Sequence, residues 1–180
     1  MNLTTYISEA LRTAKPLATK DALIHGALGL LTESAEYAET IVCHWDAGLH
    51  AGGTVIEELG DGAWFAVYTA NAAGVSLAND TVLSYNAPAR PLTHAITALR
   101  YNVAAGKVGT RIKAFVVYNK PIDADALRSE LSDVVRALID CCKANRVVFG
   151  DVLAQNIAKL KLRYPDAYSD AAAITRADKE

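Results

Sequence analysis

The chain has few cysteines and almost no net charge, and both shortages exclude classes of protein. Its three cysteines among 180 residues have no metal-ligand spacing and form no disulfide framework, so no structural zinc is expected. A net charge of -2 argues against a general binder of nucleic acid or of anionic membranes. Glycine and proline are also scarce, and the 52% hydrophobic content is a globular value. The composition therefore predicts one globular domain over residues 1–180.

Long apolar runs are missing as well. Residues 62–79 carry no charge, but Thr69, Asn71 and Gly74 interrupt them, so a buried helix followed by a turn is expected instead of a membrane span. Near the start, Glu9 stands where a signal peptide would need an apolar block. The sequence therefore predicts a cytoplasmic protein without an export signal and without a membrane partner.

Apolar residues recur with the period of an α-helix along most of the chain, and no segment shows sustained strand-like alternation. Helices are expected at residues 3–14, 20–45, 54–73, 76–86, 92–118, 123–145 and 149–163. Thr54, with Glu57 completing a capping box, is a candidate N-cap of the third helix, and Gly74 is a candidate for its C-terminal end. The β-forming residues 115–117 would make a lone strand without a partner. The predicted fold is therefore all-α.

Two pairs of acidic residues stand out on these helices: Glu33 with Glu36, and Glu58 with Asp61. A spacing of three places both members of a pair on one helix face. Core-like residues follow each pair, and carboxylates that are partly buried need a compensating charge. Because Mg²⁺ prefers oxygen ligands of this kind, the pairs predict a metal site. Two solvated helix faces are the alternative interpretation.

The order of helices recurs in the second half of the chain. A gap-free shift lays residues 58–61 on residues 130–133, but it leaves the first acidic pair without acidic counterparts. We interpret the recurrence as an internal tandem repeat, or pseudo-dimer, with coincidence between two helical hairpins as the alternative. Residues 20–86 would carry the acidic site, and residues 92–165 would form a degenerate half that ends in a basic helix. One site per chain is therefore expected.

These motifs resemble the MazG-like all-α nucleoside triphosphate pyrophosphohydrolases, a group related to dimeric dUTPases. The acids match that family's pattern of Glu-x-x-Glu, a gap, and then Glu-x-x-Asp, and residues 156–165 match the Asn-x-x-Lys-Leu-x-x-Arg-Tyr-Pro ending of many members. The resemblance covers residues 22–86 and 152–169. Residues 87–151 are longer than the middle of a typical single-repeat member, and Thr32 stands where many members have another acid. The resemblance implies a helical bundle of this family's type.

The resemblance also implies an activity. Members cleave a nucleoside triphosphate between its α and β phosphates, which gives a monophosphate and pyrophosphate. Glu33, Glu36, Glu58 and Asp61 would then be the catalytic residues and the ligands of Mg²⁺, for which Mn²⁺ can substitute. Glu36 and Glu57 are the alternatives for the general base, and the number of metal ions stays open.

Basic and aromatic residues would hold the nucleotide. Lys159 and Arg163 lie four apart and share a helix face with Asn156, so they can offer charge and forked donors to phosphate oxygens. The resemblance places these three residues and Tyr164 at the substrate, and a solvated basic helix is the alternative. Trp45 either stacks on the nucleobase or packs in the core.

Three further residues have open interpretations. Trp64 forms either a pocket wall or part of the core, and Arg176 either reaches the phosphates or belongs to a frayed terminus. His25 is expected to be an ordinary helix histidine. For the whole chain, a non-catalytic helical interaction module and a phosphohydrolase that releases orthophosphate are the rival functions. Members are commonly oligomeric, so a homo-oligomer is expected unless the pseudo-dimer suffices alone.

Overall fold

The structure is a computed structural model that describes residues 1–47, 52–77, 85 and 92–179, with side chains for 1–43, 54–77, 85 and 92–178. The helices in these ranges are α1 (Leu3–Leu11), α2 (Thr19–Ala47), α3 (Gly52–Ala72), α5 (His94–Tyr118), α6 (Ala124–Ala144), α7 (Phe149–Arg163), α8 (Asp170–Thr175) and the 3-10 turn η1 (Ala177–Lys179). The described residues contain no strand, which confirms the all-α prediction. None of the described helices has the length and apolar character needed to span a membrane.

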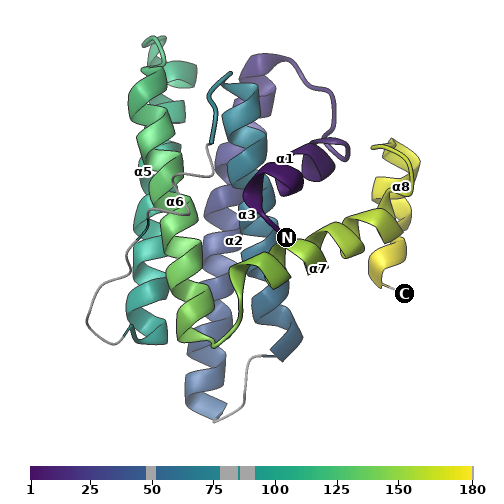
Figure 1. The fold of residues 1–180 in the computed structure, drawn as a ribbon. Helices are drawn as coiled ribbons and strands as arrows, with labels where there is room; N and C mark the ends of the chain where they lie inside the picture. Colours follow the sequence, from purple (N-terminus) through teal and green to yellow (C-terminus); the bar gives the residue numbers. More distant parts are fainter. Residues whose placement is uncertain (48–51, 78–84, 86–91, 180) are drawn as a thin grey trace.

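Four long helices form a bundle (Figure 1). Helix α2 packs against α3 and α5, α5 packs against α6, and α3 also contacts α6. The shorter α1 and α7 contact each other and lie against α3, and α8 continues from the far end of α7 (Figure 1). The acidic residues of α2 and α3 therefore lie within one bundle that α7 reaches from the side.

Regular apolar spacing explains the core. Leu23, Leu30 and Tyr37 of α2 are separated by two helical turns each, and all three are fully buried. Leu131 and Leu138 of α6 repeat the same spacing and are also fully buried. Burying a side chain of this size contributes about 1.5–3 kcal/mol, so this stripe is what holds each helix against the next.

Two glycines allow helices to approach closely near the acidic residues. A Cβ atom at Gly29 of α2 would lie 2.2 Å from the Phe65 ring of α3, and one at Gly60 of α3 would lie 2.9 Å from Cβ of Asn156 on α7. Gly29 precedes Glu33 by about one helical turn, and Gly60 directly precedes Asp61. These two glycines therefore determine how closely the acidic residues approach the facing helices.

The helix ends agree only partly with the sequence-based predictions. Helix α3 already begins at Gly52, so Thr54 lies in its first turn and the predicted capping box is wrong. The helical preference of the residues that follow outweighs the cost of about 1 kcal/mol for each glycine in a helix. Gly74 ends the helix as predicted, because it adopts φ +67° and the Val75 N–H donates to the Ala70 carbonyl oxygen at 2.9 Å.

Other predicted boundaries also change. The first helix ends at Leu11 instead of residue 14. Residues 115–117 are helical within α5, which confirms the predicted helix there and not the rival strand. Ser76 and Leu77 are not helical, and most of the helix predicted at 76–86 lies outside the described residues. The two predicted halves correspond to the hairpins α2–α3 and α5–α6, but their origin by duplication stays a prediction.

Candidate metal centre and adjoining pocket

Three of the four predicted metal ligands meet between α2 and α3. One carboxylate oxygen from each of Glu33, Glu36 and Glu58 lies within 4.8 Å of the other two. Glu58 is buried, Glu33 is half-buried and Glu36 is exposed. Helical spacing explains how α2 supplies the first two, whereas the packing of α3 on α2 brings in the third. We call these three residues the carboxylate cluster.

The cluster retains a proton in the absence of a cation. Burial, together with the charges of Asp61, Glu36 and Glu58, raises the pKa of Glu33 to about 8. Burial also raises the pKa of Glu58, while the hydrogen bond from Glu33 acts in the opposite direction. Glu33 and Glu58 therefore share a proton at neutral pH through their hydrogen bond, because three carboxylates this close cannot all be charged without compensation.

Among the described side chains, no lysine or arginine neutralises the cluster. Of the lysines and arginines that the structure describes, none forms an ion pair with Glu33, Glu36 or Glu58. All the donors are hard carboxylate oxygens, which are the ligands that Mg²⁺ and Mn²⁺ prefer. Oxygens on an octahedral Mg²⁺ lie about 3.0 Å apart when adjacent and about 4.2 Å apart when opposite, so the three carboxylates would draw together as the ion binds.

The fourth predicted ligand, Asp61, lies beside the cluster in a different bonding situation. Its Oδ1 accepts from Nδ2 of Asn156 at 2.8 Å and from Nζ of Lys159 at 2.6 Å, and its Oδ2 accepts from Lys159 at 2.5 Å. Oδ1 of Asn156 in turn accepts from the buried Tyr6 hydroxyl at 2.7 Å. This chain fixes the Asp61 carboxylate and joins α3 to α1 and α7.

The residues predicted to bind substrate therefore have protein partners. Asn156 is buried, with 4% of its surface exposed, and supports Asp61. Lys159 forms ion pairs with two acids of α3, Asp61 and, at 3.4 Å, Glu57. Its side chain is 16% exposed, so the ammonium group lies at the edge of the site.

The remaining predicted substrate residues lie further along the chain. Arg163 forms a forked ion pair with Asp178, and Tyr164 is buried with its ring 5.4 Å from that of Tyr168. Both Arg163 and Tyr164 line the pocket described below. The side chain of Trp45 lies outside the part of the chain that the structure describes.

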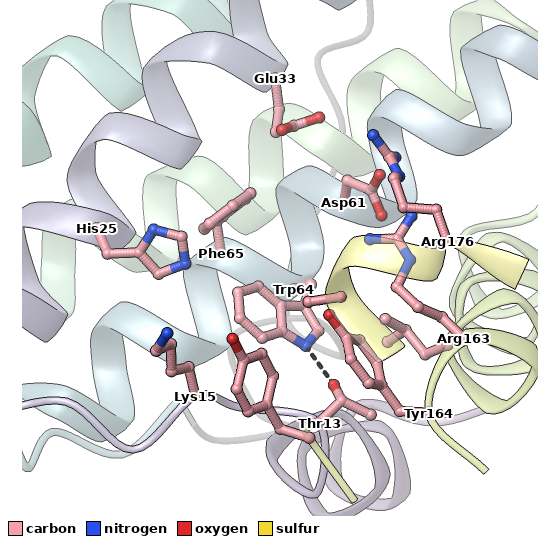
Figure 2. Close-up of a pocket in the computed structure, with 13 residues that line it drawn as sticks. Thr13, Lys15, His25, Glu33, Asp61, Trp64, Phe65, Arg163, Tyr164 and Arg176 are labelled. Atoms are coloured by element: carbon pink, nitrogen blue, oxygen red, sulfur yellow. Dashed lines mark hydrogen bonds between the residues drawn. The ribbon is translucent and has the colours of Figure 1, made fainter. Parts of the chain in front are cut away.

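A pocket of about 400 Å³ extends from the acidic residues to a group of aromatic side chains (Figure 2). Glu33 and Asp61 line one end of it, and Trp64 and Phe65 line its middle. In Figure 2, Arg163 and Arg176 lie on the Asp61 side, whereas His25 and Lys15 lie on the opposite side. Its residues come from α2, α3, α7, the connection between α1 and α2, and the chain after α7. One cavity therefore combines carboxylates, cations and aromatic rings.

Trp64 has a fixed orientation in this pocket. Its indole N–H donates to Oγ1 of the buried Thr13 at 3.0 Å and to the Ala10 carbonyl oxygen at 3.2 Å. Tyr68 stacks on one face of the indole, with a centroid distance of 4.9 Å and an interplanar angle of 12°. Because one face and the polar edge are occupied, a flat ligand can reach only what remains of the ring. Trp64 thus acts as both core residue and pocket wall.

Several pocket residues were not identified as site residues from the sequence. Lys15, Phe65 and Tyr168 line the cavity, and Asp178 forms an ion pair with Arg163. Their positions depend on how α1, α3 and the C-terminal segment meet, and no short motif marks them. Tyr6 is similar, because its role depends on Asn156, which is 150 residues away in the sequence.

The second hairpin does not repeat the carboxylate cluster. Glu130, the counterpart of Glu58 in the proposed repeat, accepts two hydrogen bonds from Arg111, both at 2.7 Å. An arginine therefore supplies the positive charge that the first hairpin lacks. Among the described residues, the carboxylate cluster is the one group found with the proximity a metal site requires.

Fold and site together define an all-α helical bundle in which a carboxylate cluster adjoins an aromatic, partly basic pocket. No family model matches the chain, and the comparisons with curated proteins and with solved structures likewise found no match. The resemblance to the MazG-like group therefore depends on the sequence motifs alone and stays a hypothesis.

Proposed function

We propose that the protein is a metal-dependent nucleotide pyrophosphohydrolase that cleaves a nucleoside triphosphate between its α and β phosphates. The observation that carries this proposal is the carboxylate cluster: three carboxylate oxygens lie within 4.8 Å of one another, and none of the three residues pairs with a lysine or arginine among the described side chains. An arrangement of this kind is costly unless a cation binds. The motif resemblance supplies the reaction type.

The residues present fit a divalent ion. Glu33, Glu36 and Glu58 would hold it, and Asp61 could join them if Lys159 moved to a substrate phosphate. When bound, Mg²⁺ or Mn²⁺ would neutralise phosphate charge, polarise the phosphorus under attack and lower the pKa of a bound water. The neighbouring pocket has the size of a small-molecule site, about 400 Å³.

The pocket supports a nucleotide as the substrate. Arg163 and Arg176, on the Asp61 side of the pocket, can pair with phosphate oxygens, and the aromatic side chains around Trp64 offer an apolar surface to a flat base (Figure 2). The phosphates would point to the carboxylate cluster, because Glu33 and Asp61 line that end of the pocket.

The chain offers two candidates for the base that activates water. In the proposed step, a water oxygen bonds to the α-phosphorus, the bond from that phosphorus to the bridging oxygen breaks, and pyrophosphate leaves with that oxygen. The water proton passes to a carboxylate, for which Glu36 and Glu57 remain the alternatives. Glu36 is exposed and belongs to the cluster, whereas Glu57 lies 3.4 Å from Lys159.

Product analysis tests the proposal. We would incubate the protein with a panel of ribo- and deoxynucleoside triphosphates and Mg²⁺ or Mn²⁺, and separate the products. Monophosphate and pyrophosphate in equal amounts are expected. Orthophosphate would indicate the other hydrolytic class, and no turnover of any nucleotide would favour a non-catalytic module.

Variants connect the activity to the cluster. Glu58→Gln should lower turnover at least about a hundredfold, because it removes a charged ligand at nearly constant volume. Glu39→Gln is the matched control, since Glu39 is an exposed acid on the same helix as Glu33 and is not part of the cluster. Equal activity of the two variants would exclude the cluster from the chemistry.

A further inference from the structure

The C-terminal segment, residues 166–178, supplies a carboxylate to a pocket cation. Nε of Arg163 donates to Oδ1 of Asp178 at 2.6 Å, and its second terminal nitrogen donates to Oδ2 at 2.5 Å. The Asp178 carboxylate is covered by Arg163 and its surroundings, while Asp178 as a residue is half-buried, and the Arg163 side chain is 18% exposed. This two-pronged geometry is also the one in which a guanidinium group binds a phosphate. Asp178 therefore occupies the donors that an anionic ligand in the pocket would use.

Much of the rest of the segment lies at the surface, although Tyr168, Ala172 and Ala173 pack against the hydrophobic core. Helix α8 has no buried residue, and Ile174 at its end is 83% exposed. The ion pair of Lys15 with Asp170 is exposed on both sides, at 43% and 70%, and such pairs contribute little. At the start of the segment, Arg12 donates to the carbonyl oxygens of Tyr164 and Asp166. The segment is therefore anchored at its start, and Asp178 supplies its one buried ion pair.

The segment also forms part of the pocket. Ala173 and Arg176 line the cavity together with Arg163. Helix α7 contacts both α8 and η1, and Arg176 directly precedes η1, so the pair of Arg163 with Asp178 lies next to the pocket wall that Arg176 forms.

We propose that Asp178 is an intramolecular competitor for the anion-binding donors of Arg163, so that a phosphate-bearing ligand must displace the end of the C-terminal segment to bind. The identity of the ligand as a nucleotide or pyrophosphate rests on the proposed function, whereas the competition itself rests on the ion pair. The apparent affinity for the ligand is then the intrinsic affinity multiplied by the fraction of molecules in which Arg163 is not paired with Asp178.

The exchange replaces one bound anion with another. A carboxylate carries one negative charge, whereas pyrophosphate carries several and can also pair with Arg176, which lies on the same side of the pocket as Arg163 (Figure 2). Pyrophosphate therefore competes effectively, while a singly charged anion does not. The buried pair holds the segment closed until a multiply charged ligand arrives.

Binding of inorganic pyrophosphate to the full chain tests the proposal, measured by titration calorimetry with a chelator present so that no metal contributes. Asp178→Asn keeps the shape and removes the charge, and we expect it to bind pyrophosphate about tenfold more tightly than the unaltered protein. Asp170→Asn is the matched control, because it removes the other carboxylate that pairs with a pocket cation, and its affinity should match that of the unaltered protein. Arg163→Gln should abolish the difference made by Asp178→Asn.

Hydrogen exchange supplies a second measurement. Pyrophosphate should accelerate exchange of the amides of residues 172–178 in the unaltered protein, because the segment is released as the anion binds. An affinity of Asp178→Asn equal to or weaker than that of the control, or a segment whose exchange slows with pyrophosphate, would overturn the competition. Neither readout needs turnover, so a protein that hydrolyses nucleotides but fails these tests refutes only this inference, and the reverse result refutes only the proposed function.

Discussion

Binding of a divalent ion should release a proton from the carboxylate cluster. The perturbation is the addition of Mn²⁺ or Mg²⁺ to the metal-free protein between pH 7 and 9. Burial and three neighbouring carboxylates raise the pKa of Glu33 to about 8. The ion must displace that proton before Glu33 can act as a ligand, because a metal binds the carboxylate form.

The size of the effect follows from this pKa of about 8. Glu33 would release about 0.9 proton per ion at pH 7, about 0.5 at pH 8 and about 0.1 at pH 9. The apparent affinity should therefore be about tenfold weaker at pH 7 than at pH 9. Because the proton is shared with Glu58 through their hydrogen bond, the release belongs to the pair and not to one residue alone.

Titration calorimetry in buffers of different ionisation enthalpy measures the number of protons directly. Glu33→Gln should release almost none at any of these pH values, and Glu39→Gln should behave like the unaltered protein. Metal binding that releases no proton at pH 7, or a release that does not fall towards pH 9, would refute the electrostatic reasoning.

Three further predictions concern stability. The raised pKa of Glu33 means that the folded chain binds more protons than the unfolded chain between pH 4.5 and about 8, so its stabilising contribution is complete below pH 4.5 and is lost as the pH rises through 8. Thermal unfolding of the metal-free protein should show this loss, about 2 kcal/mol after allowance for partial exposure, and Glu33→Gln should remove the pH dependence. Gly60→Ala should cost about 1–3 kcal/mol in denaturant unfolding, because its Cβ would lie 2.9 Å from Asn156, and an unchanged midpoint would contradict the close α3–α7 contact. Tyr6→Phe should cost about 1–3 kcal/mol by leaving the Asn156 oxygen without its donor, and a neutral effect would show that this buried hydrogen bond is not needed.

The fold class follows from sequence alone because helix formation and burial share the same apolar period. The spacing of Leu23, Leu30 and Tyr37 is enough to mark the buried stripe of α2. The pairs at Glu33 and Glu58 likewise indicate which acids share helix faces. The pattern does not give the distance between two helices. That distance depends on the size of the residues at the contact, such as the glycine where α2 meets α3.

The parts of the site that escape prediction depend on contacts between distant segments. Sequence spacing favours phosphate-facing positions for Lys159 and Asn156, but the way α7 crosses α3 directs both to Asp61. Asp178 pairs with Arg163 because the chain turns back after α7, and no local pattern requires that turn. Sequence spacing also does not decide whether Trp64 lies in the pocket or in the core. Its indole N–H donates to Thr13, which holds the ring in place while the ring lines the pocket.

The most direct test of the central claim is a crystal structure of the protein grown with Mn²⁺, with data collected to locate manganese by its anomalous scattering. We expect a manganese peak within bonding distance of carboxylate oxygens from Glu33, Glu36 and Glu58, and its loss in Glu58→Gln. A well-ordered cluster without such a peak at saturating Mn²⁺ would contradict the account, because the three carboxylates would then coexist without the cation that their proximity requires.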